Sequence, residues 1–67
     1  MAKIAHIKAK NLHVGDRLVV QEGSIRKYRR LCEVHVTKDE VTAIYITQTG
    51  FEAQVFKPMH RVRINLA

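Results

Sequence analysis

The sequence predicts a small all-β domain, and three features of the chain predict it. Three glycines and one proline, Gly15, Gly23, Gly50 and Pro58, separate runs that are rich in β-branched and aromatic residues. Within those runs, apolar and polar residues alternate with the period of two that a half-buried strand requires. No long window places apolar residues at the i, i+3, i+4, i+7 spacing of an amphipathic helix. We therefore expect short strands joined by turns.

The first two expected strands lie in the N-terminal half of the chain. One strand covers residues 17–21, after a turn at residues 14–16, and the polar stretch 21–27 is expected to form a long loop. The strand over residues 28–37 has the clearest alternation. Its side chains predicted to face the core are Cys32, Val34 and Val36.

A hairpin and a second turn are expected next. Residues 37–40 are a short polar connection to a strand over residues 41–47, which is rich in residues that favour a pleated surface. This strand should pair with the strand that precedes it. Gly50 then supplies the positive φ of a tight turn that leads into a strand over residues 51–56.

Pro58 ends that strand because proline has no amide hydrogen to donate to a sheet. We expect one helical turn at residues 57–60 and a last strand over residues 61–65. Residues 1–11 could add an edge strand, cover one end of the fold or form a basic N-terminal arm, and the sequence does not decide among these. Residues 12–67 make up the predicted domain.

The order of these elements, with the segment Leu12-His13-Val14-Gly15-Asp16-Arg17, resembles small basic Src-homology-3-like barrel proteins of the KOW or Tudor type. Those modules share an opening in which a Gly-Asp turn precedes an alternating strand. The resemblance implies a five-stranded Src-homology-3-like barrel with one short helical turn before the last strand. It also implies that the first and last strands lie close together. A fold of this kind does not by itself define a function.

The length of the chain limits the size of its core. A domain of 67 residues buries only about 60% of the surface that its unfolded chain exposes, so self-association into a homo-oligomer would help to stabilise it. Cys32 is the only cysteine, which excludes an internal disulfide and indicates a reducing compartment. The first residues lack the pattern of a secretory signal, and no apolar run is long enough to span a membrane. We therefore expect a cytoplasmic protein with no membrane contact.

The charge of the chain indicates the sign of its partners. Twelve Lys and Arg against six Asp and Glu give a formal net charge of +6. Such an excess favours polyanions, and either the phosphate backbone of a nucleic acid or the surface of an acidic protein would satisfy it.

The densest cluster of charge places four cations around one aromatic ring, in the run Arg26-Lys27-Tyr28-Arg29-Arg30, with no acidic residue inside it. Guanidinium and ammonium groups replace counterions on phosphates, and a tyrosine ring stacks on a base of any identity. The run therefore predicts nucleic-acid binding without sequence preference. The alternative interpretation is a solvated loop whose tyrosine folds back onto the domain.

A second group of cations lies on the last expected strand. Arg61 and Arg63 should face outward, Lys57 precedes them, and the fold expected from the resemblance would bring Arg17 near. These cations could extend the basic surface. Alternatively, they could be the charges that edge strands carry to prevent aggregation.

The sequence favours neither a metal site nor a catalytic nucleophile. Cys32 and His35 are three residues apart on one expected strand and so should face opposite sides. There is no Cys-x-x-Cys or paired-histidine motif, so we expect no metal and no cofactor. No motif places a base beside the thiol, which we expect to pack in the core.

One enzyme family gives a remote alternative. The chain is similar to the plasmid-encoded, trimethoprim-insensitive dihydrofolate reductases at Gly15-Asp16-Arg17 and at Gln54-Val55-Phe56. The resemblance implies a tetrameric barrel enzyme that would depend most on Gln54. However, Ala53 and Phe56 replace the valine and tyrosine of the family's Val-Gln-Ile-Tyr segment, and its pore lysine falls at Val20.

Our main prediction is therefore a protein that is not an enzyme and binds DNA or RNA mainly through phosphate contacts. The predicted site residues are Arg26, Lys27, Tyr28, Arg29, Arg30, Lys57, Arg61 and Arg63. The alternative is a protein-docking module or inhibitor that engages an acidic partner protein, which would suit a short phage-like or mobile-element gene product.

Overall fold

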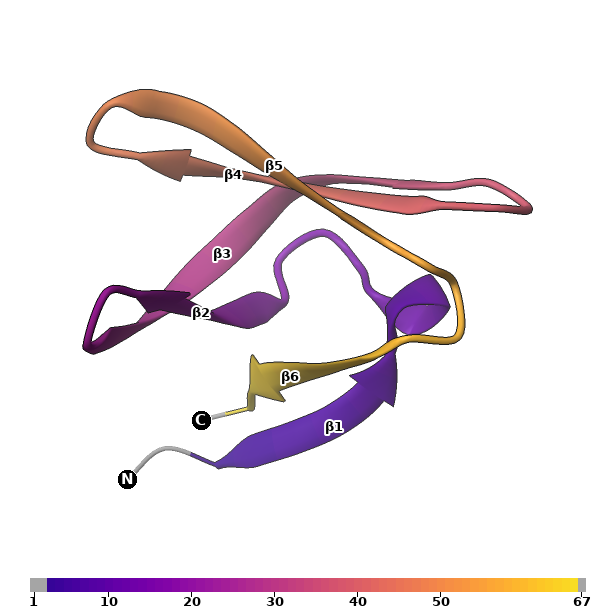
Figure 1. Cartoon of the computed structure of the whole chain (residues 1–67), viewed down its shortest axis with the longest axis horizontal. Coiled ribbons are helices and arrows are strands. Elements are labelled where there is room, and N and C mark those ends of the chain that lie inside the picture. Colours follow the sequence, from indigo (N-terminus) through magenta and orange to yellow (C-terminus); the bar gives the residue numbers. More distant parts are fainter. Residues whose placement is uncertain (1–2, 67) are drawn as a thin grey trace.

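A computed structural model describes residues 3–66 and shows an all-β chain (Figure 1). Its six strands and one short 3-10 helix are β1 (Ile4–Lys8), η1 (Ala9–Asn11), β2 (Arg17–Glu22), β3 (Ile25–Val36), β4 (Val41–Thr47), β5 (Gly50–Phe56) and β6 (Arg61–Asn65).

The strands form one antiparallel sheet in the order β1-β6-β2-β3-β4-β5. β1 and β5 are its two edges, so the sheet is open, whereas the expected fold had five strands in a closed barrel. The sixth strand comes from the N-terminal segment, where Ala5 and Ile7 pack against the core beside β6. Of the three alternatives for residues 1–11, the structure thus contains an edge strand at residues 4–8.

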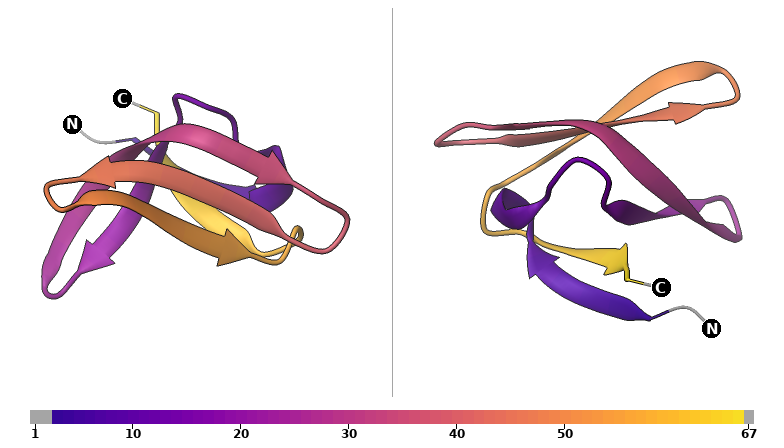
Figure 2. Two further views of the ribbon diagram at one scale, coloured as in Figure 1. Left: turned by 90° about the horizontal axis from the view of Figure 1, so that it is seen from above. Right: turned by 180° about the vertical axis from the view of Figure 1, so that it is seen from behind.

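The sheet bends into two halves because β3 belongs to both of them. Its first part, residues 25–30, pairs with β2, and its second part, residues 31–36, pairs with β4 with a β-bulge between Leu31 and Glu33. A bulge adds one unpaired residue, bends the strand and increases its twist. Figures 1 and 2 show β3 leaving the β2–β3 hairpin and crossing the molecule to lie along β4.

The bulge also changes which side chains of β3 face inward. Leu31 is 1% exposed and therefore faces inward, and Cys32 is exposed. In an unbroken strand the next inward residue would be Glu33. Because pairing with β4 resumes at Glu33 after the bulge, Val34 faces inward instead. The prediction that Cys32 and Val36 pack in the core is therefore wrong. The Cys32 thiol instead donates to the carbonyl oxygen of Ile44 at 3.3 Å, and Val36 lies at the exposed end of the strand.

Two expected connections also differ. The stretch 21–27 is not a long loop: β2 continues to Glu22, and β3 begins at Ile25 after a two-residue turn at Gly23 and Ser24. Gly23 permits this turn because its φ is +64°.

The helical turn expected at residues 57–60 is a β-turn, closed by a hydrogen bond of 3.0 Å from the His60 N–H to the Lys57 carbonyl oxygen. The short helix is η1 instead. Its Ala9 N–H donates to the carbonyl oxygen of His60 at 2.8 Å, which fastens η1 to the start of β6.

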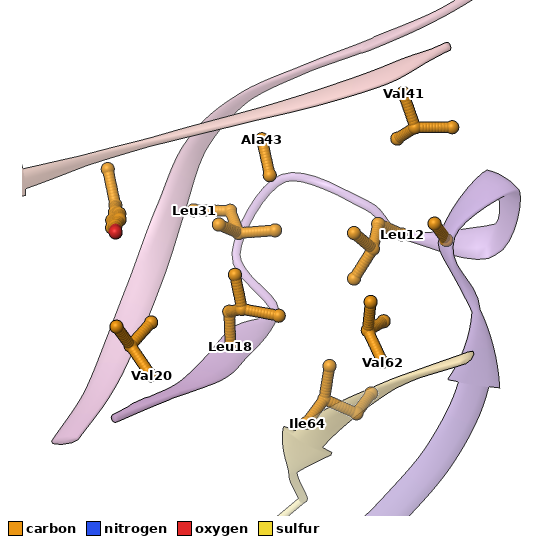
Figure 3. Close-up of a cluster of buried hydrophobic side chains, with 10 residues drawn as sticks. Leu12, Leu18, Val20, Leu31, Val41, Ala43, Val62 and Ile64 are labelled. Atoms are coloured by element: carbon orange, nitrogen blue, oxygen red, sulfur yellow. The ribbon is translucent and has the colours of Figure 1, made fainter. Parts of the chain in front are cut away.

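The hydrophobic core lies between the two halves of the sheet, and Leu12 projects into it from the segment after η1 (Figure 3). Figure 3 also shows Val41 and Ala43 on the β4 side, with Val62 and Ile64 on the β6 side. The remaining buried side chains are Ala9, Leu18, Val20, Leu31 and Tyr45. The expected hairpin of β3 and β4 and the inward placement of Val62 and Ile64 are confirmed.

Candidate functional site

The register of the β2–β3 hairpin sorts its side chains into two faces. Directly opposed residues of an antiparallel pair share a face, and Leu18 and Val20 are buried. The outer face therefore carries three opposed pairs, which are Arg17 with Arg30, Val19 with Tyr28 and Gln21 with Arg26.

β6 and β1 extend this outer face. On β6 the exposed Arg61 and Arg63 alternate with buried apolar residues, and β1 places Lys8 opposite Arg61 and His6 opposite Arg63. Arg17 lies opposite Asn65 of β6, so the two hairpins are joined. The result is one continuous outer surface across β1, β6, β2 and β3.

We call this surface the cationic face, and define it by six side chains: Lys8, Arg17, Arg26, Arg30, Arg61 and Arg63. Each of the four strands contributes three outward positions to it, and none of these strand positions is Asp or Glu. Two pairs of cations, Lys8 with Arg61 and Arg17 with Arg30, are directly opposed. Directly opposed like charges destabilise a sheet, so an anion bound over Lys8 and Arg61 would relieve a repulsion.

Two of the predicted site residues lie on the other side of the hairpin. Arg29 forms an ion pair with Glu22, with Nη2 at 3.0 Å from Oε2, and the Lys27 Nζ lies 3.9 Å from Oε1 of the same carboxylate. The basic run has no acidic residue within it, but its two inward cations are partly neutralised by Glu22 across the hairpin.

Lys57 lies apart from the cationic face. It belongs to the β-turn between β5 and β6, where the neighbouring Pro58 carbonyl oxygen accepts a hydrogen bond of 3.0 Å from the Lys10 N–H. Of the eight predicted residues, the structure therefore brings together Arg26, Tyr28, Arg30, Arg61 and Arg63.

The predicted set omitted two members of the face. Lys8 and Arg17 complete it, and His6 lies among its outward positions. The signal for Lys8 was the alternation of Ala5 and Ile7 with His6 and Lys8, which has the period of a half-buried strand.

Tyr28 is the only Phe, Tyr or Trp at the outward strand positions of the cationic face, and its side chain is available to a ligand. The residue is 39% exposed and lies opposite Val19. It also lines a groove of about 610 Å³ with Arg30, Cys32 and Ile46. Tyr28 thus belongs to a strand and not to the solvated loop of the alternative interpretation, and its ring is partly exposed on the outer side of the sheet.

Gln54, on which the reductase resemblance depends, points to the inner side of β5. Its Nε2 donates to the hydroxyl of the buried Tyr45 at 3.2 Å. It also lines a small cavity of about 170 Å³ with Phe56 and His60, whose rings stack with centroids 5.8 Å apart.

Residues 3–66 contain neither a metal cluster nor a helix that could cross a membrane. Within that range, no three His, Cys, Asp or Glu side chains lie close enough together to hold a metal ion. None of the described helices has the length and apolar character needed to cross a membrane. No family model matches the chain, and no curated protein or solved structure is significantly similar to it.

Proposed function

We propose that this protein binds nucleic acid, mainly through contacts between the cationic face and phosphate groups. The observation that carries the proposal is that six Lys and Arg side chains share one outer surface whose strand positions include no carboxylate. Cations clustered in this way release counterions when they neutralise a phosphate backbone. Contacts of this kind position a nucleic acid but do not read its sequence.

Tyr28 favours a nucleic acid over an acidic protein as the partner. Its partly exposed ring lies between Arg26 and Arg30 on the same strand, and a base can stack on it whatever its identity. Carboxylate side chains on a protein surface offer no comparable flat group.

We also retain as a proposal the relation to Src-homology-3-like modules. Without β1, the order β6-β2-β3-β4-β5 places the last strand beside the first of the five expected strands, as the resemblance implies. The pairing of Arg17 with Asn65 supports this relation.

A salt series on matched variants tests the proposed function. Fluorescence anisotropy would follow the binding of labelled duplex and single-stranded oligonucleotides over a range of NaCl concentrations, with polyglutamate as a comparator. The double variant Arg30→Ala with Arg63→Ala removes two charges from the cationic face. The control, Lys38→Ala with Lys57→Ala, removes two charges from exposed turns elsewhere.

We expect log affinity to fall linearly with log salt concentration. The slope should decrease by up to about 1.8 in the face variant, because each lost phosphate contact on a duplex contributes about 0.9. It should stay unchanged in the control. Equal weakening by both variants would show that net charge alone matters. Absence of binding to any nucleic acid at low salt, or equal binding to polyglutamate, would overturn the proposal.

A further inference from the structure

The outer side of the other half of the sheet is apolar where β4 meets β5. Ile44 and Ile46 face outward because they alternate with buried Ala43 and Tyr45. Phe51 of β5 lies directly opposite Ile46 on the same face. Ile46 is 59% exposed and Phe51 is 71% exposed, so two large apolar side chains lie next to each other in contact with solvent.

Two grooves meet over this surface. The groove of about 610 Å³ beside Tyr28 includes Cys32 and Ile46, and a second groove of about 550 Å³ includes the same two residues. The second groove continues to Ile44 and Phe51. We call the combined feature the bulge groove, and its two ends carry the rings of Tyr28 and Phe51.

Cys32 lies in this groove at the β-bulge of β3. Leu31 pairs with Tyr45 and Glu33 pairs with Ile44, so Cys32 has no directly opposed partner and its side chain is exposed. Because Leu31 is buried, alternation alone already turns Cys32 outward. The bulge then keeps Glu33 on the outer side as well and turns Val34 inward, so Cys32 and Glu33 both line the groove.

The charges around the bulge groove are unequal at its two ends. Arg30 lines the end near Tyr28 and lies opposite Arg17, so this end continues into the cationic face. Glu33 lines the other end, where its carboxylate lies 3.2 Å from Nε2 of His35. A phosphate would be attracted to the Arg30 end and repelled at the Glu33 end.

A ligand that fits both surfaces needs flat apolar groups attached to a chain of anions. A single-stranded nucleic acid has this composition, because its unstacked bases can leave the backbone and lie against aromatic rings. In a duplex the base faces are stacked on one another and are not available. A second copy of this chain would bring a further charge of +6 toward Arg30 and Arg17.

We infer that the bulge groove holds the unstacked bases of a single strand while the phosphate backbone follows the cationic face. This inference rests on the proposed function and specifies its substrate class. Tyr28 and Phe51 act as stacking platforms, and Arg30 contacts the backbone where it passes from the cationic face to the groove. The cationic face provides affinity for any nucleic acid, and the groove selects single strands.

The first test uses Phe51→Ala and a matched control, Val55→Ala. Both residues lie on the outer side of β5 and are more than half exposed, but only Phe51 lines the bulge groove. Their high exposure means that neither change should cost much stability. Anisotropy would compare a single-stranded oligothymidylate of about 12 nucleotides with a duplex of equal length.

We expect the wild-type protein to prefer the single strand. Phe51→Ala should weaken that binding by about tenfold, which is the loss of one stacked base, and should leave duplex affinity unchanged. Val55→Ala should match the wild type with both ligands. Equal behaviour of the two variants, or equal loss with duplex, would overturn the inference.

The second test uses the unmodified chain and does not depend on the folding of any variant. Cys32 is the only thiol and it lines the groove, so its alkylation rate reports on occupancy. Saturating oligothymidylate should slow alkylation at least several-fold, whereas saturating duplex should not.

The two tests separate failure of the inference from failure of the proposed function. If the alkylation rate of Cys32 is unchanged when the protein is saturated with a single strand, the bulge groove does not hold the bases and the inference fails. The proposed binding by the cationic face would still stand. The rate of Cys32 alkylation could instead fall as the protein concentration rises and not respond to oligothymidylate. That result would show that a second copy of the chain covers the groove, and it would also overturn the inference. If no nucleic acid binds at low salt, the proposed function fails as well.

Discussion

The side chains of Glu22 on β2 and Arg29 on β3 form an ion pair on the inner side of the β2–β3 hairpin, and the carboxylate accepts two hydrogen bonds of 3.1 Å from the guanidinium Nε and Nη2. Arg30 follows Arg29 in the sequence but points to the opposite face, where it lies beside Arg17. Two adjacent arginines thus have different electrostatic surroundings, one beside a carboxylate and one directly opposite another cation.

The first prediction compares these two arginines. Arg30→Ala should weaken nucleic-acid binding and lower the salt slope by about 0.9 for a duplex, because it removes a cation from the cationic face. Arg29→Ala should change affinity little, and its stability cost should not exceed about 1 kcal/mol, because Glu22 is partly exposed and solvent screens the pair. Anisotropy and urea denaturation measure the two effects. Equal loss of affinity in both variants would contradict the division of the hairpin into two faces.

The second prediction concerns the two residues at the bulge. Leu31→Ala should destabilise the domain by roughly 2–5 kcal/mol, because Leu31 is 1% exposed and its removal leaves a cavity between the halves of the sheet. Cys32→Ala should change the free energy of unfolding by no more than about 0.5 kcal/mol, because Cys32 is exposed. Urea denaturation followed by circular dichroism gives both values. The opposite order of effects would mean that the alternation visible in the sequence continues through β3.

This contrast shows why the sequence predicted the strands better than their faces. β4 and β6 were expected over residues 41–47 and 61–65, and the structure has the same bounds because local alternation and adjacent turns determine them. In β3, Cys32, Val34 and Val36 alternate as regularly as an undisturbed strand would. The bulge depends on pairing with β4, so no pattern within β3 reveals it.

The same distinction applies to the candidate site. The basic run is visible in the order of residues along the chain, but that order does not show that Glu22 pairs with Arg29 across a tight turn. It also could not show that β1 would place Lys8 opposite Arg61. Both facts follow from pairings between strands, which a single sequence does not specify.

The third prediction concerns the turn that leads into β2. Gly15 has a φ of +97°, and its N–H donates to the Leu31 carbonyl oxygen at 2.8 Å, so the turn is fastened to β3 at the bulge. Gly15→Ala should destabilise the domain by about 1–2 kcal/mol through backbone strain, since no atom lies within 4 Å of the added methyl group.

Ser24→Ala is the control for this variant, because Ser24 lies in an exposed turn with a negative φ and should tolerate alanine. Thermal unfolding of the two variants under identical conditions provides the comparison. A melting temperature of Gly15→Ala equal to that of the wild type would show that this turn relaxes without strain.

The fourth prediction tests whether the N-terminal strand is part of the folded domain. Ile7 is half-buried and packs against the core, while its neighbour His6 is exposed on the opposite side of β1. Ile7→Ser should lower the free energy of unfolding by about 1–2 kcal/mol, because apolar contact with the core is lost. His6→Ser should leave it nearly unchanged. Urea denaturation distinguishes an edge strand from a detached basic arm, in which both substitutions would be neutral.

The same variant should also affect binding. Since β1 contributes Lys8 to the cationic face, loosening the strand in Ile7→Ser should weaken nucleic-acid binding, although Ile7 itself does not lie on that face.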